Sequence, residues 1–234
     1  MCGRFTQQMT WQQLHHLYSL SGQAPQLNLR ARYNGAPTQD FAVCRLDERG
    51  GRTIARLRWG LVPSWAKDIR MGARLINARA ETVHFKPSFS AAFRFRRCLV
   101  PANGWFEWKR AGPAKQPWFV ALAEGSPLSF AALWERWNKA EEPVESFTII
   151  TTAAAPDLAD IHERQPAIIP PGRFDQWLDP ASPLPQLLEL VRQPCAGPFQ
   201  PRAVSTRVNR VANDDPGILD PPKRSDLTGM HDII

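Results

Sequence analysis

Several common sequence features are missing from this chain, and each absence excludes a class of protein. Its four cysteines include no C-x-x-C pair of the kind that binds zinc, so we expect no metal site and no cofactor. The N-terminus lacks the apolar segment of a signal peptide, and no stretch approaches the roughly 18 apolar residues of a membrane span. We therefore expect a cytoplasmic protein with reduced thiols that does not bind membranes.

The chain also shows no internal repeat and no linker rich in glycine, serine or proline. Its 22 prolines and 14 glycines make up 36 of 234 residues, which is below the low-complexity range, so the many prolines indicate ordered loops. An apolar fraction of 43% is enough for a sizeable core. We predict one monomeric domain over residues 1–216 and a C-terminal tail, residues 217–234, with a loose end.

Helical periodicity is rare along the chain. Thr10 and Gln13 form a capping-box pattern before a helix that should stop at Gly22. Residues 171–178 and 184–191 predict two further short helices, and a helical turn is expected over residues 157–163. Residues 24–37 and 61–74 lack any period, so we expect them to be ordered loops.

Short apolar segments typical of strands dominate instead. A turn over residues 47–51 joins the first two of them into a predicted hairpin. The predicted strands are residues 40–46, 53–59, 98–100, 105–110, 118–123, 129–134, 147–152 and 202–206. Many short strands with few helices favour an α+β fold with a strongly curved, mostly antiparallel and barrel-like sheet, flanked by a few short helices.

The second residue of the chain, Cys2, is a chemical opportunity if Met1 is removed, and a small second residue favours that removal. The α-amine, with a pKa of about 7.7–8.0, and the thiol, with one of about 8.5, would then lie on adjacent carbons. Such an aminothiol can condense with an aldehyde through a Schiff base and close a five-membered thiazolidine. The thiol could also attack an amide or ester, and Cys2 could equally be an ordinary residue of a loose terminus.

Few side chains could assist Cys2 in this chemistry. Glu107 lies within the aromatic segment Trp105–Trp108, where it either faces water on an edge strand or is a buried acid with a raised pKa. His162 follows a predicted strand, a place where functional loops often lie. Asn77 lies in a segment whose backbone conformation the sequence leaves open.

Several short motifs follow one another from residue 2 to about residue 216. They are Met1-Cys2-Gly3-Arg4-Phe5, Arg32-Tyr33-Asn34 with Ala36-Pro37, Trp59-Gly60-Leu61-Val62-Pro63 with Trp65, Asn77-Ala78-Arg79-Ala80-Glu81-Thr82, Gly104-Trp105-Phe106-Glu107-Trp108, Asp160-Ile161-His162 and Val204-Ser205. Together they resemble the SRAP family, the SOS response-associated peptidases, which act on abasic sites in DNA. Gln165 departs from the pattern, because we expect a basic or apolar residue there.

The resemblance implies a mechanism. Cys2, freed of Met1, would condense with the aldehyde of a ring-opened abasic deoxyribose and cap it as a stable thiazolidine DNA–protein crosslink. Glu107 would act as general acid and base, and His162 would assist proton transfer at the sugar and reversal of the crosslink. Asn77 would orient the Cys2 end by hydrogen bonds. AP lyase activity and a self-processing peptidase activity that removes Met1 are also implied.

The resemblance also implies a partner, single-stranded DNA with abasic sites, which would make the protein nucleoid-associated when bound. Arginines would hold phosphates, while tryptophans and a proline would stack on bases or wedge between them, unless the tryptophans pack in the core. The residues predicted to contact DNA are Arg4, Asn34, Pro37, Trp65, Arg79 and Trp108. A net charge of +7 and nine tryptophans suit such a partner.

Two other functions explain part of the pattern. The Met-Cys-Gly start also resembles class II glutamine amidotransferases, whose N-terminal cysteine hydrolyses glutamine, and Asn103-Gly104 could form the oxyanion hole of such an enzyme. This hypothesis leaves the basic charge and the tryptophans unexplained. A nucleic-acid-binding module without covalent chemistry is the third hypothesis.

Overall fold

The core of the protein is a closed barrel. The residues that the computed structural model describes are 2–20, 29–111, 114–195 and 197–223. The strands of the barrel are β3 (Asp40–Leu46), β4 (Arg52–Trp59), β6 (Arg97–Ala102), β9 (Leu128–Trp137) and β10 (Val144–Ala153). The sheet closes because β10 pairs with both β4 and β9, and every barrel pair except β4–β10 is antiparallel. The predicted α+β fold with a barrel-like, mostly antiparallel sheet is therefore confirmed.

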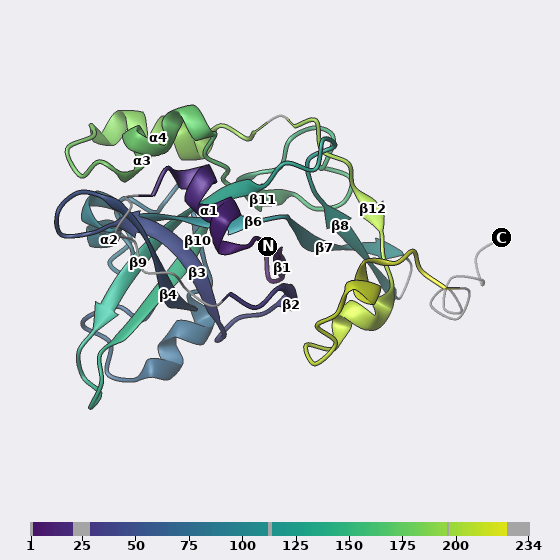
Figure 1. Ribbon diagram of the computed structural model, residues 1–234, viewed down its shortest axis with the longest axis horizontal. Coiled ribbons are helices and arrows are strands. Elements are labelled where there is room, and N and C mark those ends of the chain that lie inside the picture. Colours follow the sequence, from purple (N-terminus) through teal and green to yellow (C-terminus); the bar gives the residue numbers. More distant parts are fainter. Residues whose placement is uncertain (1, 21–28, 112–113, 196, 224–234) are drawn as a thin grey trace.

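A second, antiparallel sheet lies beside the barrel. In spatial order its strands are β12 (Arg202–Ala203), β8 (Ala114–Val120), β7 (Gly104–Ala111), β1 (Phe5–Gln7) and β2 (Arg32–Gly35). Figure 1 shows the β7–β8 hairpin at the right of the barrel, with β1 between the two. Because β1 pairs with both β7 and β2, the start of the chain runs into the space between the sheets.

Two short strands extend the neighbours of β10 along its length. β5 (Asn77–Arg79) pairs in parallel with Ile149–Thr151 and continues the line of β4. β11 (Arg164–Pro166) pairs with Thr151–Ala153 on the opposite edge and continues the line of β9. These two strands bring Asn77 and the segment of His162 to the same end of β10.

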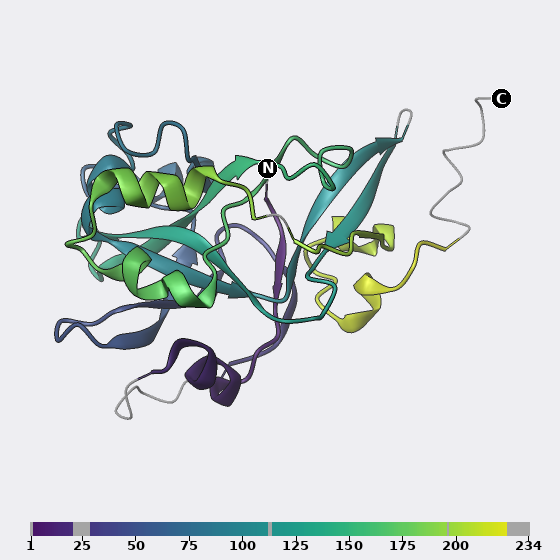
Figure 2. The same ribbon diagram turned by 90° about the horizontal axis from the view of Figure 1, so that it is seen from above.

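Alternate residues of the barrel strands face opposite sides. On β3, Phe41 and Val43 belong to an interior cluster with Phe5, whereas Ala42 and Cys44 face the cluster that the helices cover. Those helices are α1 (Trp11–Tyr18), α2 (Ser90–Phe95), α3 (Phe174–Leu178) and α4 (Leu184–Arg192). Figure 2 shows α3 and α4 next to each other over the barrel strands.

The capping box at the start of α1 is confirmed. The Gln13 backbone N–H donates to Thr10 Oγ1 at 3.3 Å, and the Thr10 N–H donates to Gln13 Oε1 at 2.8 Å. The predicted end of the helix is wrong, because the chain leaves it at Ser19, which has a left-handed φ of 47°. Gly22 lies outside the described residues.

The predicted loop over residues 24–37 contains β2 and is wrong in that part; residues 24–28 lie outside the described chain. Four residues are too few to show an alternating pattern, and β2 forms because β1 offers its backbone as a partner. Residues 61–74 are mostly loop, as predicted, and end in the 3₁₀ helix η1 (Ile69–Arg74). Residues 171–178 form the 3₁₀ turn η2 (Pro171–Arg173) and then α3.

The C-terminal part packs on the second sheet. The predicted strand 202–206 is shorter than expected, because Ser205 Oγ accepts from the Arg207 backbone N–H and starts the 3₁₀ helix η3 (Thr206–Asn209). A further 3₁₀ helix, η4 (Pro216–Leu219), places Ile218 fully buried in an apolar cluster of this sheet. Of the predicted tail, residues 217–223 are described by the structure, and residues 224–234 lie outside the described chain.

None of the four cysteines forms a disulfide. The helical turn predicted over residues 157–163 is confirmed, because the His162 N–H donates to the carbonyl oxygen of Leu158, four residues earlier. Over the described ranges, no helix has the length and apolar character needed to cross a bilayer. Within the same residues, no three histidine, cysteine, aspartate or glutamate side chains are grouped to hold a metal ion.

Candidate active site

Cys2 is completely buried just before β1, in the space between the two sheets. It belongs to the interior cluster that also contains Phe5 and Trp105. The pairing of Phe5 with Trp105 draws the start of the chain along β7, toward Glu107. The interpretation of Cys2 as an ordinary residue of a loose terminus is therefore wrong, because this cysteine is part of the core.

Asn77 holds this end of the chain in place. Its Nδ2 donates to the carbonyl oxygen of Cys2 at 2.8 Å. Its Oδ1 is buried and accepts no hydrogen bond from the described residues. A single amide side chain therefore fixes the backbone of Cys2 and keeps an acceptor for a further donor.

The position of Asn77 depends on a close backbone contact earlier in the chain. Gly60 follows β4 with a φ of 116°, and a Cβ there would lie 2.6 Å from the carbonyl oxygen of Gly72. Both the positive φ and the close approach require glycine at this position. The contact lets residues 61–74 fold back, so that β5 reaches β10 in register with Ile149 opposite Asn77.

Glu107 lies in the middle of the second sheet. Because β7 pairs with β8 on one side and β1 on the other, it is not an edge strand, and the interpretation of a water-facing glutamate is wrong. The Glu107 side chain is 5% exposed. Burial raises the pKa of this carboxyl group to about 7. At neutral pH the group is therefore present in both protonation states, as a general acid and base requires.

His162 faces Glu107 from the turn before β11. Its Nε2 lies 3.9 Å from Glu107 Oε2. The backbone N–H of Arg164 lies 2.9 Å from His162 Nδ1 and the carbonyl oxygen of Arg164 lies 3.2 Å from it, so this backbone holds the ring with Nε2 toward Glu107 in either tautomer. Burial lowers the pKa of His162, which favours the neutral form near pH 7.

The Cys2 thiol is less acidic than its position in the sequence indicates. Burial, and then the negative charge of Glu107, raise the pKa of this thiol well above its ordinary value. The expectation of a partly ionised thiol near neutrality does not hold in the folded chain. The thiol therefore needs a base to take its proton, and the carboxylate of Glu107 lies close enough to influence it.

Arg164 was not among the predicted site residues. Its guanidinium group pairs with Glu81 at 2.5 Å and donates to the carbonyl oxygen of Thr151 at 2.6 Å. These contacts hold the segment of His162 against β10. Arg164 also lines a small cavity together with Trp105, Glu107, Val120, Leu158, Ile161 and His162. Its place two residues after His162 is the one signal in the sequence that could have suggested it.

Two of the predicted DNA contacts are engaged inside the protein. Arg4 Nη1 donates to Asn34 Oδ1 and to the carbonyl oxygen of Val208, both at 2.8 Å. The buried Asn34 amide also donates to the carbonyl oxygens of Val208, Arg210 and Asn213. This pair therefore ties β1 and β2 to the C-terminal segment. Burial lowers the pKa of Arg4, whose guanidinium group is half-buried.

The other predicted DNA contacts are more accessible. Arg79 is exposed, and Trp65 is 51% exposed on the loop after β4. Pro37 and Trp108 are half-buried, and Trp108 Nε1 donates to Asn209 Oδ1 at 2.8 Å. Because Arg79 and Trp65 lie on the surface, their side chains are accessible to a nucleic acid.

Asp214 and Gln165 were not predicted as site residues, and both fix segments that lie beside the site. Asp214 accepts from the backbone N–H groups of Tyr33 and Asn34 and pairs with Arg32 at 2.7 Å, which fixes β2. The unexpected Gln165 is buried, where its Oε1 accepts from the Ala155 N–H at 2.8 Å and its Nε2 donates to the carbonyl oxygen of Cys195. Gln165 thus bridges two loops that an apolar residue could not join.

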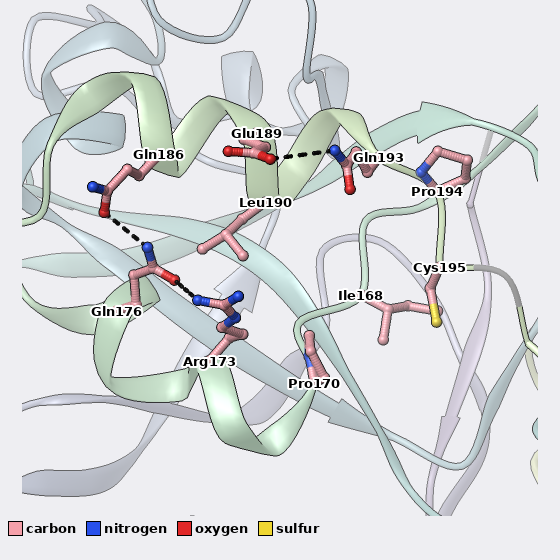
Figure 3. Close-up of a pocket in the computed structure, with 10 residues that line it drawn as sticks. All are labelled: Ile168, Pro170, Arg173, Gln176, Gln186, Glu189, Leu190, Gln193, Pro194 and Cys195. Atoms are coloured by element: carbon pink, nitrogen blue, oxygen red, sulfur yellow. Dashed lines mark hydrogen bonds between the residues drawn. The ribbon is translucent and has the colours of Figure 1, made fainter.

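One of the hollows on the surface of the described chain does not contain the site. It measures about 300 Å³ and lies beside α3 and α4, with Ile168 and Leu190 in its walls and Cys195 at one end (Figure 3). Hydrogen bonds from Arg173 to Gln176 and from Gln176 to Gln186 line one side of it. None of Cys2, Asn77, Glu107 and His162 lines this hollow.

Comparison with known proteins identifies the family. The SRAP model, described as SOS response associated peptidase, matches residues 1–211. The abasic site processing protein YoqW of Bacillus subtilis is 36% identical over 223 residues, covering 94% of this chain and 99% of that protein. The abasic site processing protein YedK of Escherichia coli is 32% identical over 227 residues, covering 94% of this chain and all of YedK.

The fold agrees with these matches. A crystal structure of a protein from Bacteroides thetaiotaomicron superimposes with a TM-score of 0.83 and covers 94% of this chain and 99% of that one, at 23% identity. At that identity the likeness concerns the fold alone. Together with the match to the family over nearly the whole sequence, these relatives establish that the chain belongs to the SRAP family.

Proposed function

We propose that this protein processes abasic sites in DNA by forming a covalent crosslink through Cys2 after Met1 has been removed. The observation that carries the proposal is the grouping of three side chains around a buried Cys2. Asn77 fixes its carbonyl oxygen, Glu107 raises the pKa of its thiol, and His162 lies 3.9 Å from Glu107. The relatives named abasic site processing proteins support the choice of substrate.

The first step joins the α-amine of Cys2 to the C1 aldehyde of the ring-opened deoxyribose. The amine nitrogen adds to the carbonyl carbon, and the resulting carbinolamine loses one water molecule to give an imine. Glu107, with a pKa of about 7, donates a proton to the departing hydroxyl group. The free Oδ1 of Asn77 accepts from the amine and directs its lone pair at the aldehyde.

The second step closes the ring. The thiol sulfur adds to the imine carbon, its proton passes to the carboxylate of Glu107, and the imine nitrogen takes a proton to become an amine. The new C–S bond replaces the π bond of the imine, and the C–N single bond remains. The product is therefore a thiazolidine, and one water molecule is released overall. The high pKa of the buried thiol makes the base at Glu107 necessary.

His162 acts mainly at the sugar. Its Nε2 lies on the side of Glu107, where it gives a proton to the ring oxygen of the sugar as the ring opens and takes that proton back as the ring closes. Reversal requires that same oxygen to re-form the closed sugar, so loss of His162 should slow release at least as much as capture. AP lyase activity and removal of Met1 by self-processing are part of this proposal for the same group of residues.

The DNA partner is single-stranded in this proposal. Arg79 contacts the phosphate beside the lesion, and Arg4 contributes the guanidinium nitrogens that Asn34 and Val208 do not engage. Trp65, Trp108 and Pro37 stack on or wedge between neighbouring bases. The protein acts as a monomer in the cytoplasm and is found on the nucleoid when it is bound to DNA.

No observation favours the amidotransferase hypothesis over this one. Asn103 Oδ1 accepts from the Gln8 backbone N–H at 2.8 Å, so this side chain ties the end of β1 to the start of β7. A Cβ at Gly104 would lie 2.4 Å from Phe119, which explains this glycine by packing alone.

The proposal is tested by incubating the purified protein with single-stranded DNA that carries one abasic site. We expect an adduct that survives heat without a reductant, and intact-mass measurement should find that active protein begins at Cys2. Glutamine hydrolysis is the control for the amidotransferase hypothesis. Active protein that retains Met1, or purely reversible binding, would refute the thiazolidine mechanism.

A further inference from the structure

Two aromatic side chains of the described residues remain exposed on the surface after the site is accounted for. Phe85 and Phe95 are 61% and 66% exposed. They belong to two adjoining hollows that share Arg94 and Phe95, and we call these together the Phe85–Phe95 surface. Its lining residues are His84, Phe85, Ser90, Ala91, Arg94, Phe95, Pro180, Ser182, Leu184 and Leu187. No acidic side chain of the described residues lines either hollow.

The Phe85–Phe95 surface begins near the candidate active site. After β5 the chain forms successive helical turns, in which the Val83 N–H donates to Arg79 and the Lys86 N–H donates to Thr82. Phe85 comes only six residues after Arg79 in the chain. The ion pair of Glu81 with Arg164 ties the first of these turns to the segment of His162.

Charge and ring chemistry both suit a nucleic acid on this surface. Arg94 is exposed and forms no ion pair with the described residues, and the exposed Lys86 follows Phe85 directly. Aromatic rings accept any base by stacking, and nearby cations hold the connecting phosphates. Aromatic and arginine anchors also occur at protein interfaces, but the short connection to Arg79 favours the strand that already passes the site.

We propose that the Phe85–Phe95 surface binds the nucleotides that flank the abasic site, with their bases stacked on Phe85 and Phe95 and a phosphate held by Arg94. This rests on the proposed function, because the strand is placed by its lesion at Cys2. It adds a second contact region to the DNA path, beyond Arg79, and makes affinity depend on the length of the strand.

The test uses intact single-stranded oligonucleotides of increasing length, without any abasic site, and measures reversible affinity by fluorescence anisotropy. Because no aldehyde is present, the result does not depend on the crosslinking chemistry, which the wild-type adduct assay tests separately. For the long oligonucleotides we expect the double variant Phe85→Ala, Phe95→Ala to lose about tenfold or more in affinity. For the shortest ones it should match the wild type.

Matched variants distinguish stacking from a general effect on the surface. Phe85→Tyr keeps a ring and should retain the affinity for long strands, and His16→Ala, which removes an exposed ring on α1, should behave as wild type. Both phenylalanines are exposed, so the melting temperature of the double variant should be unchanged. Equal affinities of wild type and double variant at every length would overturn the proposal and indicate a protein-binding surface instead.

Discussion

Glu107 Oε2 and His162 Nε2 lie 3.9 Å apart across the junction of the second sheet and the turn before β11. Burial raises the pKa of the carboxyl group to about 7 and lowers that of the imidazole. Both shifts favour the neutral forms, so near pH 7 an acid that can still donate faces a ring that can accept or donate at Nε2. This relationship makes Glu107 the residue whose replacement should have the clearest dependence on pH.

Glu107→Gln should stabilise the protein at high pH and not at low pH. The carboxyl pKa is raised in the folded protein, so below about 4.5 it is protonated in both states and costs nothing. As pH rises toward 7, the carboxyl group of Glu107 ionises in the unfolded chain but stays largely protonated in the folded chain. Above that pH, ionised Glu107 costs the native state up to roughly 3 kcal/mol that the variant does not pay.

Urea unfolding at pH 4 and at pH 8 measures this difference. The free energy of unfolding of Glu107→Gln should equal that of wild type at pH 4 and exceed it at pH 8. Crosslinking by the variant should be slowed by about 100-fold or more, while its affinity for DNA is retained. Equal stabilities of the two proteins at both pH values would show that Glu107 is not destabilised by burial.

His162→Ala should slow reversal of the crosslink by about 100-fold, and slow its formation less. In the proposed mechanism the ring gives a proton to the sugar oxygen when the sugar opens and takes it back when the sugar closes; release depends on this second transfer, while capture can use the acid at Glu107. The measurement is transfer of preformed adduct to excess fresh abasic DNA, followed on gels over time. A variant that releases DNA as fast as wild type removes His162 from the mechanism.

Cys2→Ala should give no heat-stable adduct, because its amine can form only an imine that hydrolyses unless borohydride traps it. Cys2→Ser should give a weaker adduct, since oxygen is a poorer nucleophile than sulfur and the oxazolidine is less stable. Cys195→Ala is the matched control, because Cys195 carries no neighbouring α-amine, and it should crosslink as wild type. A heat-stable adduct of Cys2→Ala equal to wild type would point to a lysine instead.

Arg79→Ala should weaken binding to all single-stranded sequences about equally, because phosphate contacts carry no base information. Loss of one phosphate contact should also lower the slope of log affinity against log salt by about 0.7. Arg49→Ala, in the exposed turn between β3 and β4, is the control for removal of one positive charge. An unchanged salt slope in Arg79→Ala would place this arginine outside the DNA path.

The sequence alone determined the chemistry that the protein offers and much of its framework. A cysteine directly after Met1 becomes an aminothiol if Met1 is removed, and the motifs in their order along the chain indicate the family that the comparisons confirm. The capping box of Thr10 and the hairpin of β3 and β4 were predictable because they depend on residues close together in the chain. Strand-rich patterning likewise predicted the curved, mostly antiparallel sheet.

Only the tertiary structure decided the environment of the site. β1, β2, β5 and β11 have three or four residues each, too few to show a period, so they form only because other strands offer them a partner. The pairing of β1 with β7 buries Cys2 and Glu107 together, which raises both pKa values, and it turns Arg4 inward onto Asn34. Burial and long-range pairing are properties of the whole chain, and no local pattern at these residues encodes them.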